Sequence, residues 1–191
     1  MLPERADIRA WNNEARERAS GIIEAGGHIT GNTGLAADLE AVNGLCARMN
    51  AAVEEETERL LADGTLVGVG GGDHSTPYGS IRAHARRHPG LGILHVDAHA
   101  DLRDAYEGFT WSHASIFHNV MTRIPEVGTL VQVGIRDFCE AEWRMAQESG
   151  GRIRLNTDAQ VQGWLHEGQP WATICRRLVE PLPRDVYVSV D

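Results

Sequence analysis

The chain has 191 residues, 42% of them hydrophobic and 24% charged, an ordinary composition for one globular domain with a substantial core. Its formal net charge of −9 argues against nucleic acid or an anionic membrane as a partner. The sequence has no long uncharged stretch of the kind that predicts a membrane span. Three separate cysteines without a CxxC pair favour a reducing compartment, so we expect a cytoplasmic protein.

The predicted elements follow in chain order. Glycines in SGIIEAGGHITGNTG predict an irregular lead-in over residues 1–35, and a helix before these glycines is the alternative for its first part. Apolar residues then recur every three or four positions, which predicts a helix over 35–63. Beyond it, short apolar runs alternate with amphipathic runs. This pattern predicts strands at 65–71, 91–98, 128–136, 151–156 and 186–191, and helices at 78–88, 140–150 and 171–182.

Alternating strands and helices indicate the fold class. They are typical of βαβ units, and therefore of a mainly parallel sheet that helices cover on both faces. We treat residues 1–191 as part of a single α/β domain. In open sheets of this kind, ligands bind beyond the carboxyl ends of the strands. Polar residues at those ends are therefore the candidates for a functional site.

The sequence HVDAHAD at 95–101 has an ionisable residue at every odd position and a small apolar residue at every even one. In an extended chain, His95, Asp97 and their two successors would line one face. A sheet covered on both faces offers no solvated face for them, and unpaired buried charges are costly. We therefore interpret Asp97, His99 and Asp101 as a site, and the deeper His95 as a buried, hydrogen-bonded residue.

The glycine-rich sequence GVGGGDHS at 68–75 could suggest phosphate binding. It lacks the lysine of a P-loop, and a GxGxxG frame has Asp73 where the last glycine belongs. The plainer alternative is a tight turn that glycine permits. We favour a turn that brings Asp73 and His74 to the same sheet edge as Asp97. Asp191 joins them, because it stands at the end of the last predicted strand.

The potential ligands are rich in carboxylates and include no thiolate: His74, Asp97, His99, Asp101 and Asp191. Such donors suit manganese or another borderline divalent ion better than structural zinc, which prefers thiolates. Several carboxylates that can bridge suggest two ions. Two ions can lower the pKa of a shared water and supply hydroxide near neutral pH. The sequence therefore predicts a two-metal hydrolytic site.

Four short motifs stand in order at the ends of predicted elements: GGDHS (71–75), DAHAD (97–101), SHAS (112–115) and SVD (189–191). Over about residues 65–191 the chain resembles the ureohydrolase family of arginases, agmatinases and formimidoylglutamases, and looks most like the agmatinases. The resemblance implies a three-layer α/β/α fold, arginase-like, with a dinuclear manganese centre. It also implies hydrolysis of a guanidino or amidino C–N bond of a small molecule by a metal-bridging hydroxide. We further expect a homo-oligomer.

The resemblance also implies a set of metal ligands. His74 would bind the first manganese and His99 the second. Asp97 and Asp191 would bridge the two ions, and Asp101 would complete the first site.

Two residues would act on protons if the resemblance holds. Asp101 would hydrogen-bond the nucleophile and help to move its proton to the departing amine. His113, in SHAS, matches the proton-shuttle histidine of the family. General acid–base work of this kind contributes about 10²–10⁴-fold to a rate.

Arg103, in DLRDAYEGF, bears on the substrate. Arginases have an asparagine at this place, so an arginase fits less well than an agmatinase. Agmatine would be repelled by Arg103 unless Asp104 or Glu107 paired with it. Formimidoylglutamate or a guanidino acid would instead bind Arg103 through a carboxylate, and formimidoylglutamases also carry DLR here. An ordinary surface ion pair is an equal alternative for Arg103.

The last motif departs from the family pattern. In the family this pattern is SxDxD, and a later glutamate holds the guanidinium. The sequence stops at the first aspartate, Asp191, so we expect the C-terminal part of the domain to be missing, either because the chain is a fragment of a longer protein or because it is naturally truncated. We expect the 191-residue chain to be catalytically feeble or inactive, and a longer parent to be an amidinohydrolase. The alternative of another class is an inactive metal-binding relic, against which the retained His113 argues. A nucleotide-binding protein would rest on the glycine turn alone.

Overall fold

The computed structural model describes residues 5–191 and leaves residues 1–4 outside the description. Within the described part, four strands form one sheet in the order β3-β2-β1-β4, and all neighbouring pairs are parallel. The strands are β1 (Leu91–Val96), β2 (Val127–Ile135), β3 (Ile153–Thr157) and β4 (Val186–Val190). β1 is therefore a central strand that lies between β2 and β4.

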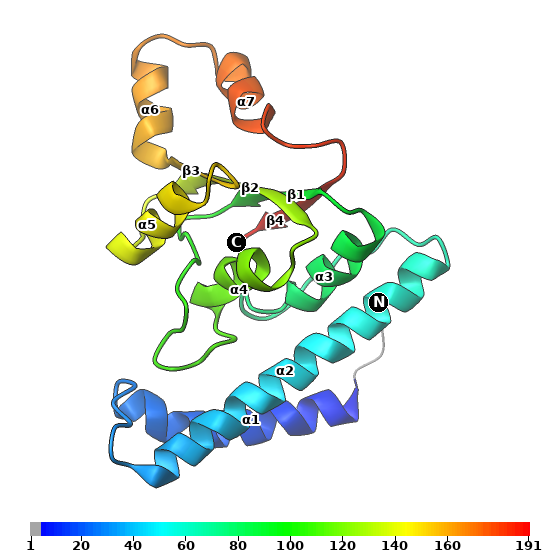
Figure 1. Cartoon of the computed structure of the whole chain (residues 1–191), viewed down its shortest axis with the longest axis vertical. Helices are drawn as coiled ribbons and strands as arrows, with labels where there is room; N and C mark the ends of the chain where they lie inside the picture. Colours follow the sequence, from blue (N-terminus) through cyan, green and yellow to red (C-terminus); the bar gives the residue numbers. More distant parts are fainter. Residues whose placement is uncertain (1–4) are drawn as a thin grey trace.

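Helices cover both faces of this sheet. They are α3 (Tyr78–Arg87), α4 (Ile116–Arg123), α5 (Glu140–Glu148), α6 (Asp158–His166) and α7 (Trp171–Val179). One buried apolar cluster, with Ile81, Phe117 and Leu130, joins α3, α4 and α5 to the sheet. A second cluster, with Val161 and Ile174, joins α6 and α7. Figure 1 shows α6 and α7 on the opposite side of the sheet from α3 and α4, so the predicted α/β/α layering is confirmed.

The order of the strands creates a switch point at β1. The chain adds β2 and then β3 on one side of β1, and it returns through α6 and α7 to add β4 on the other side. The crossovers from β1 to β2 and from β2 to β3 pass over one face of the sheet, through α4 and α5, whereas the crossover from β3 to β4 passes over the other face, through α6 and α7. Open α/β sheets bind ligands in the crevice at such a point, beyond the carboxyl ends of the strands.

The N-terminal region differs from the irregular lead-in predicted for 1–35. Its described residues hold two long helices, α1 (Ala6–Glu24) and α2 (Thr33–Ala62). The helices lie side by side (Figure 1), with Ile22 buried and Arg18 paired with Asp38 at 2.9 Å. The prediction of an irregular segment was wrong because α1 is rich in arginine and glutamate. It has too few large apolar residues for the helical period to be recognised in the sequence.

Residues 65–71, predicted as a strand, have no regular structure. Leu66 is 97% exposed, so the segment is not part of the core. The segment pairs with neither edge of the four-stranded sheet β3-β2-β1-β4. Its glycines also offer no side chains to bury. The predicted strand was therefore wrong, although the turn that follows it still reaches the sheet edge.

The other predicted elements are confirmed, with shifts of their ends: 35–63, 78–88, 91–98, 128–136, 140–150, 151–156, 171–182 and 186–191. The short helices α4 and α6 were not predicted from the sequence. Among the described residues, no helix is both long enough and apolar enough to cross a membrane.

The crossing of α2 and α3 provides a test of this packing. A Cβ at Gly79 in α3 would lie 2.7 Å from the backbone nitrogen of Glu54 and closer still to the carbonyl of Asn50. We expect Gly79→Ala to lower the free energy of unfolding by about 1–3 kcal/mol, the usual cost of overpacking. Gly163→Ala in α6, where a Cβ meets open space, should raise it by about 1 kcal/mol. Urea denaturation measures both, and a harmless Gly79→Ala would contradict the described contact.

Candidate metal centre

Four buried side chains that can bind a metal lie together beyond the carboxyl end of β1. They are His74, His95, Asp97 and Asp101, and one potential ligand atom from each lies within 4.8 Å of the others. Asp97 directly follows β1, Asp101 lies in the same loop, and His74 comes from the turn before α3. The fold therefore brings three of the five predicted ligands together and adds His95 to them.

Asp97 stands at the centre of this cluster, because donors approach both of its oxygens. Oδ1 accepts a hydrogen bond of 2.9 Å from the backbone N–H of His99. Oδ2 lies 2.9 Å from His95 Nε2 and 3.2 Å from His74 Nδ1. Burial would raise the pKa of the Asp97 carboxyl, but hydrogen bonds from His95 and His99 hold that pKa well below its ordinary value. Asp97 is therefore ionised near neutral pH.

His74 connects the carboxylates to β4. Its Nδ1 lies 2.8 Å from Asp101 Oδ2, and its Nε2 lies 2.8 Å from Ser189 Oγ. Burial opposes a positive charge on this ring, yet the neighbouring carboxylates, led by Asp101, raise the pKa of His74 above its ordinary value. The carboxylates around His74 therefore favour the protonated form of its ring.

The spacing of these atoms fits a divalent cation. His74 Nδ1 lies 2.8 Å from Asp101 Oδ2 and 3.2 Å from Asp97 Oδ2. Metal–ligand bonds of about 2.1 Å at right angles place neighbouring ligand atoms about 3 Å apart. One imidazole with two carboxylates also suits a borderline ion. His74, Asp97 and Asp101 can therefore hold one metal ion with little movement.

The backbone at Asp101 adopts an unusual conformation. Its φ of 54° lies in the left-handed region, which costs a non-glycine residue about 1–2 kcal/mol. Its carbonyl accepts a 3.0 Å hydrogen bond from the N–H of Phe117, and the N–H of Leu102 donates to Glu142 Oε1, also at 3.0 Å. Backbone strain of this kind persists where surrounding contacts enforce it, and it clusters at functional sites.

The other two predicted ligands, His99 and Asp191, border the cluster on its exposed side. Their side chains are 59% and 60% exposed. His99 Nδ1 lies 3.3 Å from Asp97 Oδ1, and Asp191 Oδ2 lies 3.7 Å from His74 Nδ1. Asp97 therefore faces the ring of His74 with one oxygen and the ring of His99 with the other.

His113 and Arg103, the predicted proton shuttle and substrate contact, lie outside the four-residue cluster. His113 is exposed at the start of a short helical turn, and its ring centre lies 5.8 Å from that of Tyr106. The guanidinium of Arg103 lies over the same Tyr106 ring, 5.4 Å from its centre. Arg103 Nε is also 3.7 Å from an oxygen of the buried Glu142. Arg103 thus has an ion-pair partner within the chain.

Two buried polar residues near the cluster, Gln132 and Ser189, were not predicted as members of the site. His95 is in register with Gln132 on β2 and with Ser189 on β4. Gln132 Nε2 lies 2.9 Å from His95 Nδ1, and Ser189 contacts His74. The signal in the sequence is one polar residue inside an otherwise apolar strand. The register of the sheet is needed to find its partner.

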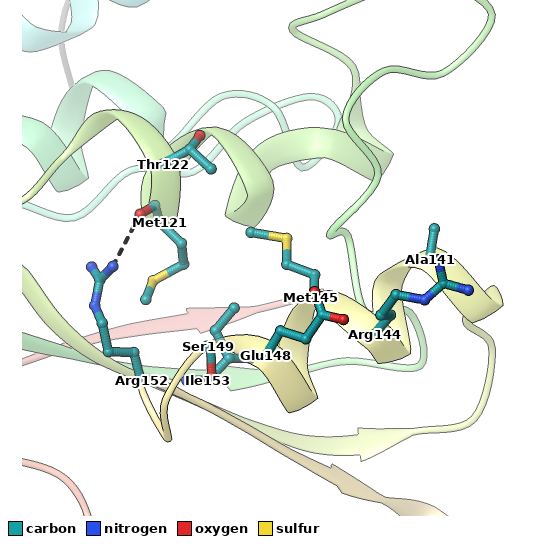
Figure 2. A pocket seen from close by; sticks show the side chains of 9 residues that line it. All are labelled: Met121, Thr122, Ala141, Arg144, Met145, Glu148, Ser149, Arg152 and Ile153. Carbon is teal, nitrogen blue, oxygen red and sulfur yellow. Dashed lines mark hydrogen bonds between the residues drawn. The ribbon is translucent and has the colours of Figure 1, made fainter.

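A separate pocket of about 430 Å³ lies between α4, α5 and β3 (Figure 2). Met121 and Met145 line it, and Arg152 at its edge donates a hydrogen bond to the Met121 carbonyl. None of its lining residues belongs to the carboxylate and imidazole cluster. The cluster beyond β1 is therefore the candidate site, and this pocket is not part of it.

The raised pKa of His74 predicts a pH dependence of stability in the metal-free protein. The protonated ring stabilises the fold below its unfolded pKa of 6.5, and this contribution is lost as the pH rises through the higher folded value. We expect His74→Asn, with chelator present, to lower the free energy of unfolding more at about pH 6 than at about pH 9. Urea titrations measure this, with the exposed His166→Asn as control. Equal losses at both pH values would contradict the charge assigned to His74.

Comparisons with known proteins identify the family of the chain. The sequence model of the Arginase family matches residues 11–191. The N(1)-aminopropylagmatine ureohydrolase of Thermus thermophilus is 35% identical over 150 residues, which cover 78% of this chain and 47% of that protein. The chain spans between a third and a half of the length of the curated relatives that it matches.

Solved structures share the fold. Proclavaminate amidinohydrolase from Streptomyces clavuligerus matches with a TM-score of 0.54 at 28% identity, over 74% of this chain and 45% of that one. The arginase from Bacillus cereus matches with a TM-score of 0.65 at 20% identity, over 80% of this chain and 55% of that one. The match of the family model over nearly the whole chain is decisive: the chain belongs to the arginase family.

Proposed function

We propose that this chain carries the metal site of a manganese-dependent, agmatinase-like ureohydrolase that cleaves a guanidino or amidino C–N bond. The observation that carries the proposal is the position of Asp97 between two imidazoles. Its Oδ2 lies 3.2 Å from His74 Nδ1, and its Oδ1 lies 3.3 Å from His99 Nδ1. A carboxylate can bridge two metal ions by offering one oxygen to each of them, and Asp97 is placed to do so.

The potential ligands divide into two sets around Asp97. His74 and Asp101, which are buried, would hold the first ion together with Asp97 Oδ2. The more exposed His99 would hold the second ion together with Asp97 Oδ1, and Asp191 would bridge from the end of β4. One imidazole per ion among several carboxylates favours Mn²⁺ over structural zinc.

Bound divalent ions would lower the pKa of water and stabilise developing negative charge near neutral pH. The water oxygen would bond to the guanidino carbon as the C–N bond breaks, which releases urea and an amine. Asp101 would take up the proton of the water and deliver it to the departing amine. His113, on the loop beside Tyr106, would exchange that proton with solvent.

For the substrate, we propose an amine-ended guanidino compound of the agmatine type. The ion pair with Glu142, at 3.7 Å, partly neutralises Arg103 and so reduces its repulsion of a cation. The name of the Thermus relative, an aminopropylagmatine ureohydrolase, supports this choice. Formimidoylglutamate or a guanidino acid is the alternative class, and its carboxylate would have to draw Arg103 away from Glu142.

A second candidate function is metal binding without catalysis. The exposure of His99 and Asp191, 59% and 60%, favours it, because the second ion would have fewer buried ligands than the first. The two functions differ in turnover and not in the binding of the first ion. The homo-oligomeric state and the cytoplasmic location stay predictions from the sequence.

Loss of the shared carboxylate should abolish metal binding. Asp97→Asn keeps the shape of the side chain and removes its charge, so we expect Mn²⁺ affinity to fall by more than about 100-fold. Calorimetric titration of the chelator-treated chain measures this affinity. Asp104→Asn is the matched control, because that carboxylate is 90% exposed, and it should bind like the wild type. Unchanged affinity in Asp97→Asn would refute the ligand role.

Product release from agmatine, guanidinobutyrate and formimidoylglutamate, each with and without Mn²⁺, tests the reaction. We expect turnover that requires Mn²⁺, is fastest with agmatine, and is slow beside the full-length Thermus relative. His113→Asn should lower kcat by about 10²–10⁴-fold and leave Mn²⁺ affinity unchanged. His166→Asn should behave like the wild type. Saturation with Mn²⁺ and no turnover of any substrate would favour the second candidate function.

A further inference from the structure

A row of polar side chains crosses the sheet directly beneath the metal cluster. His95 on β1 is the register partner of Gln132 on β2 and of Ser189 on β4. Register partners on neighbouring strands point to the same face, so the three side chains form one layer. His95 and Gln132 are both 0% exposed. Bulk solvent does not reach them, so their hydrogen bonds come from each other and from their neighbours. Gln132 Oε1 is buried without a partner among the described residues, whereas the amide nitrogen of Gln132 has two acceptors.

The direction of the hydrogen bond between Gln132 and His95 is fixed by a third group. Gln132 Nε2 lies 2.6 Å from the carbonyl oxygen of Ala100 and 2.9 Å from His95 Nδ1. A carbonyl oxygen can only accept, so the atom that faces it must be the amide nitrogen. Exchange of the amide atoms would place two acceptor oxygens against each other. The second amide hydrogen therefore points at His95 Nδ1, which must accept it.

This direction determines which ring nitrogen of His95 carries the proton. A neutral imidazole has one N–H, and Nδ1 is occupied as an acceptor, so the proton is on Nε2. His95 Nε2 lies 2.9 Å from Asp97 Oδ2 and donates to it.

We infer that Gln132 is a positioning residue, which excludes His95 from the metal shell and makes it a donor that orients Asp97. The inference rests on the proposed metal site, because it assigns a role to one member of the four-residue cluster. By distance alone, His95 is as well placed as His74 to bind an ion. A nitrogen that carries a proton has no lone pair for a metal, so His95 cannot coordinate while Gln132 donates to Nδ1.

The two histidines of the cluster thus have opposite roles, set by different partners. Ser189 Oγ lies 2.8 Å from His74 Nε2 and can accept its N–H. The metal-facing Nδ1 of His74 can then lose its proton and coordinate, as ligand histidines do when their other nitrogen donates. Gln132 produces the reverse state at His95. Partners in one layer of the sheet therefore make His74 a metal ligand and His95 a donor that orients Asp97.

The tautomer of His95 can be measured directly by ¹⁵N NMR of imidazoles in the metal-free, full 191-residue chain. We expect a protonated Nε2 and an unprotonated Nδ1 in the wild type. Gln132→Glu keeps the size of the side chain and replaces the donor with oxygens, so Nδ1 should become protonated. Asn119→Asp is the matched control. Asn119 is 1% exposed, and its Nδ2 also donates to two carbonyls, those of Thr110 and Ser115.

The same variants test the positioning role through metal affinity. Gln132→Glu should lower Mn²⁺ affinity by about 10–100-fold, as the loss of outer partners does, and Asn119→Asp should leave it unchanged. A protonated Nδ1 in the wild type would overturn the inference, even if Gln132→Glu does not fold. Wild-type affinity in Gln132→Glu would overturn it as well. If the chain binds no Mn²⁺ at all, the proposed function fails, while the tautomer measurement still decides the role of Gln132.

Discussion

Asp97 directly follows the central strand β1, and its carboxylate has lost most of its contact with water. The protein must therefore supply the hydrogen-bond donors that water would have provided. The backbone N–H of His99, the ring of His95 and the ring of His74 supply them, and the pKa of Asp97 falls although burial opposes its charge. An acceptor that needs this much compensation is also a strong ligand for a cation. The arrangement that stabilises this one charge therefore also makes Asp97 the centre of the proposed metal site.

Topology brings the other members of the site to Asp97. The strand order reverses at β1, so the ends of β1 and β4 stand side by side, and Asp191 comes next to the end of β1. The turn before α3 delivers His74 to the same place. Below them, the layer of Gln132, His95 and Ser189 fills the sheet face with hydrogen-bonded groups. The apolar clusters hold the strands and helices in position, and Phe117 of the first cluster packs against the rings of His74 and His95.

Much of the sheet and part of the site could be predicted from the sequence, because both depend on local patterns. The motif HVDAHAD indicates that Asp97 and Asp101 stand where a strand ends. The extended face that its alternation predicts stops at Val96, because Asp101 reaches the cluster from a loop with a φ of 54° and the His99 side chain is exposed. The predicted strand at 65–71 was wrong because pairing depends on which strands lie beside β1, and local pattern does not contain this. Gln132 was missed for the same reason, since its role depends on the register between β1 and β2. α1 was missed because its surface is polar on most sides.

The position at which a metal ion binds tests the proposed site most directly. Crystals of the chain grown with Mn²⁺ can be measured at the manganese absorption edge, where anomalous difference density locates the ion without reference to the surrounding atoms. We expect anomalous density within bonding distance of Asp97, Asp101 and His74 Nδ1. His95 Nε2 should point to the Asp97 oxygen and not to the ion. Density bonded to His95, or none beyond the end of β1 at saturating Mn²⁺, would contradict this proposal.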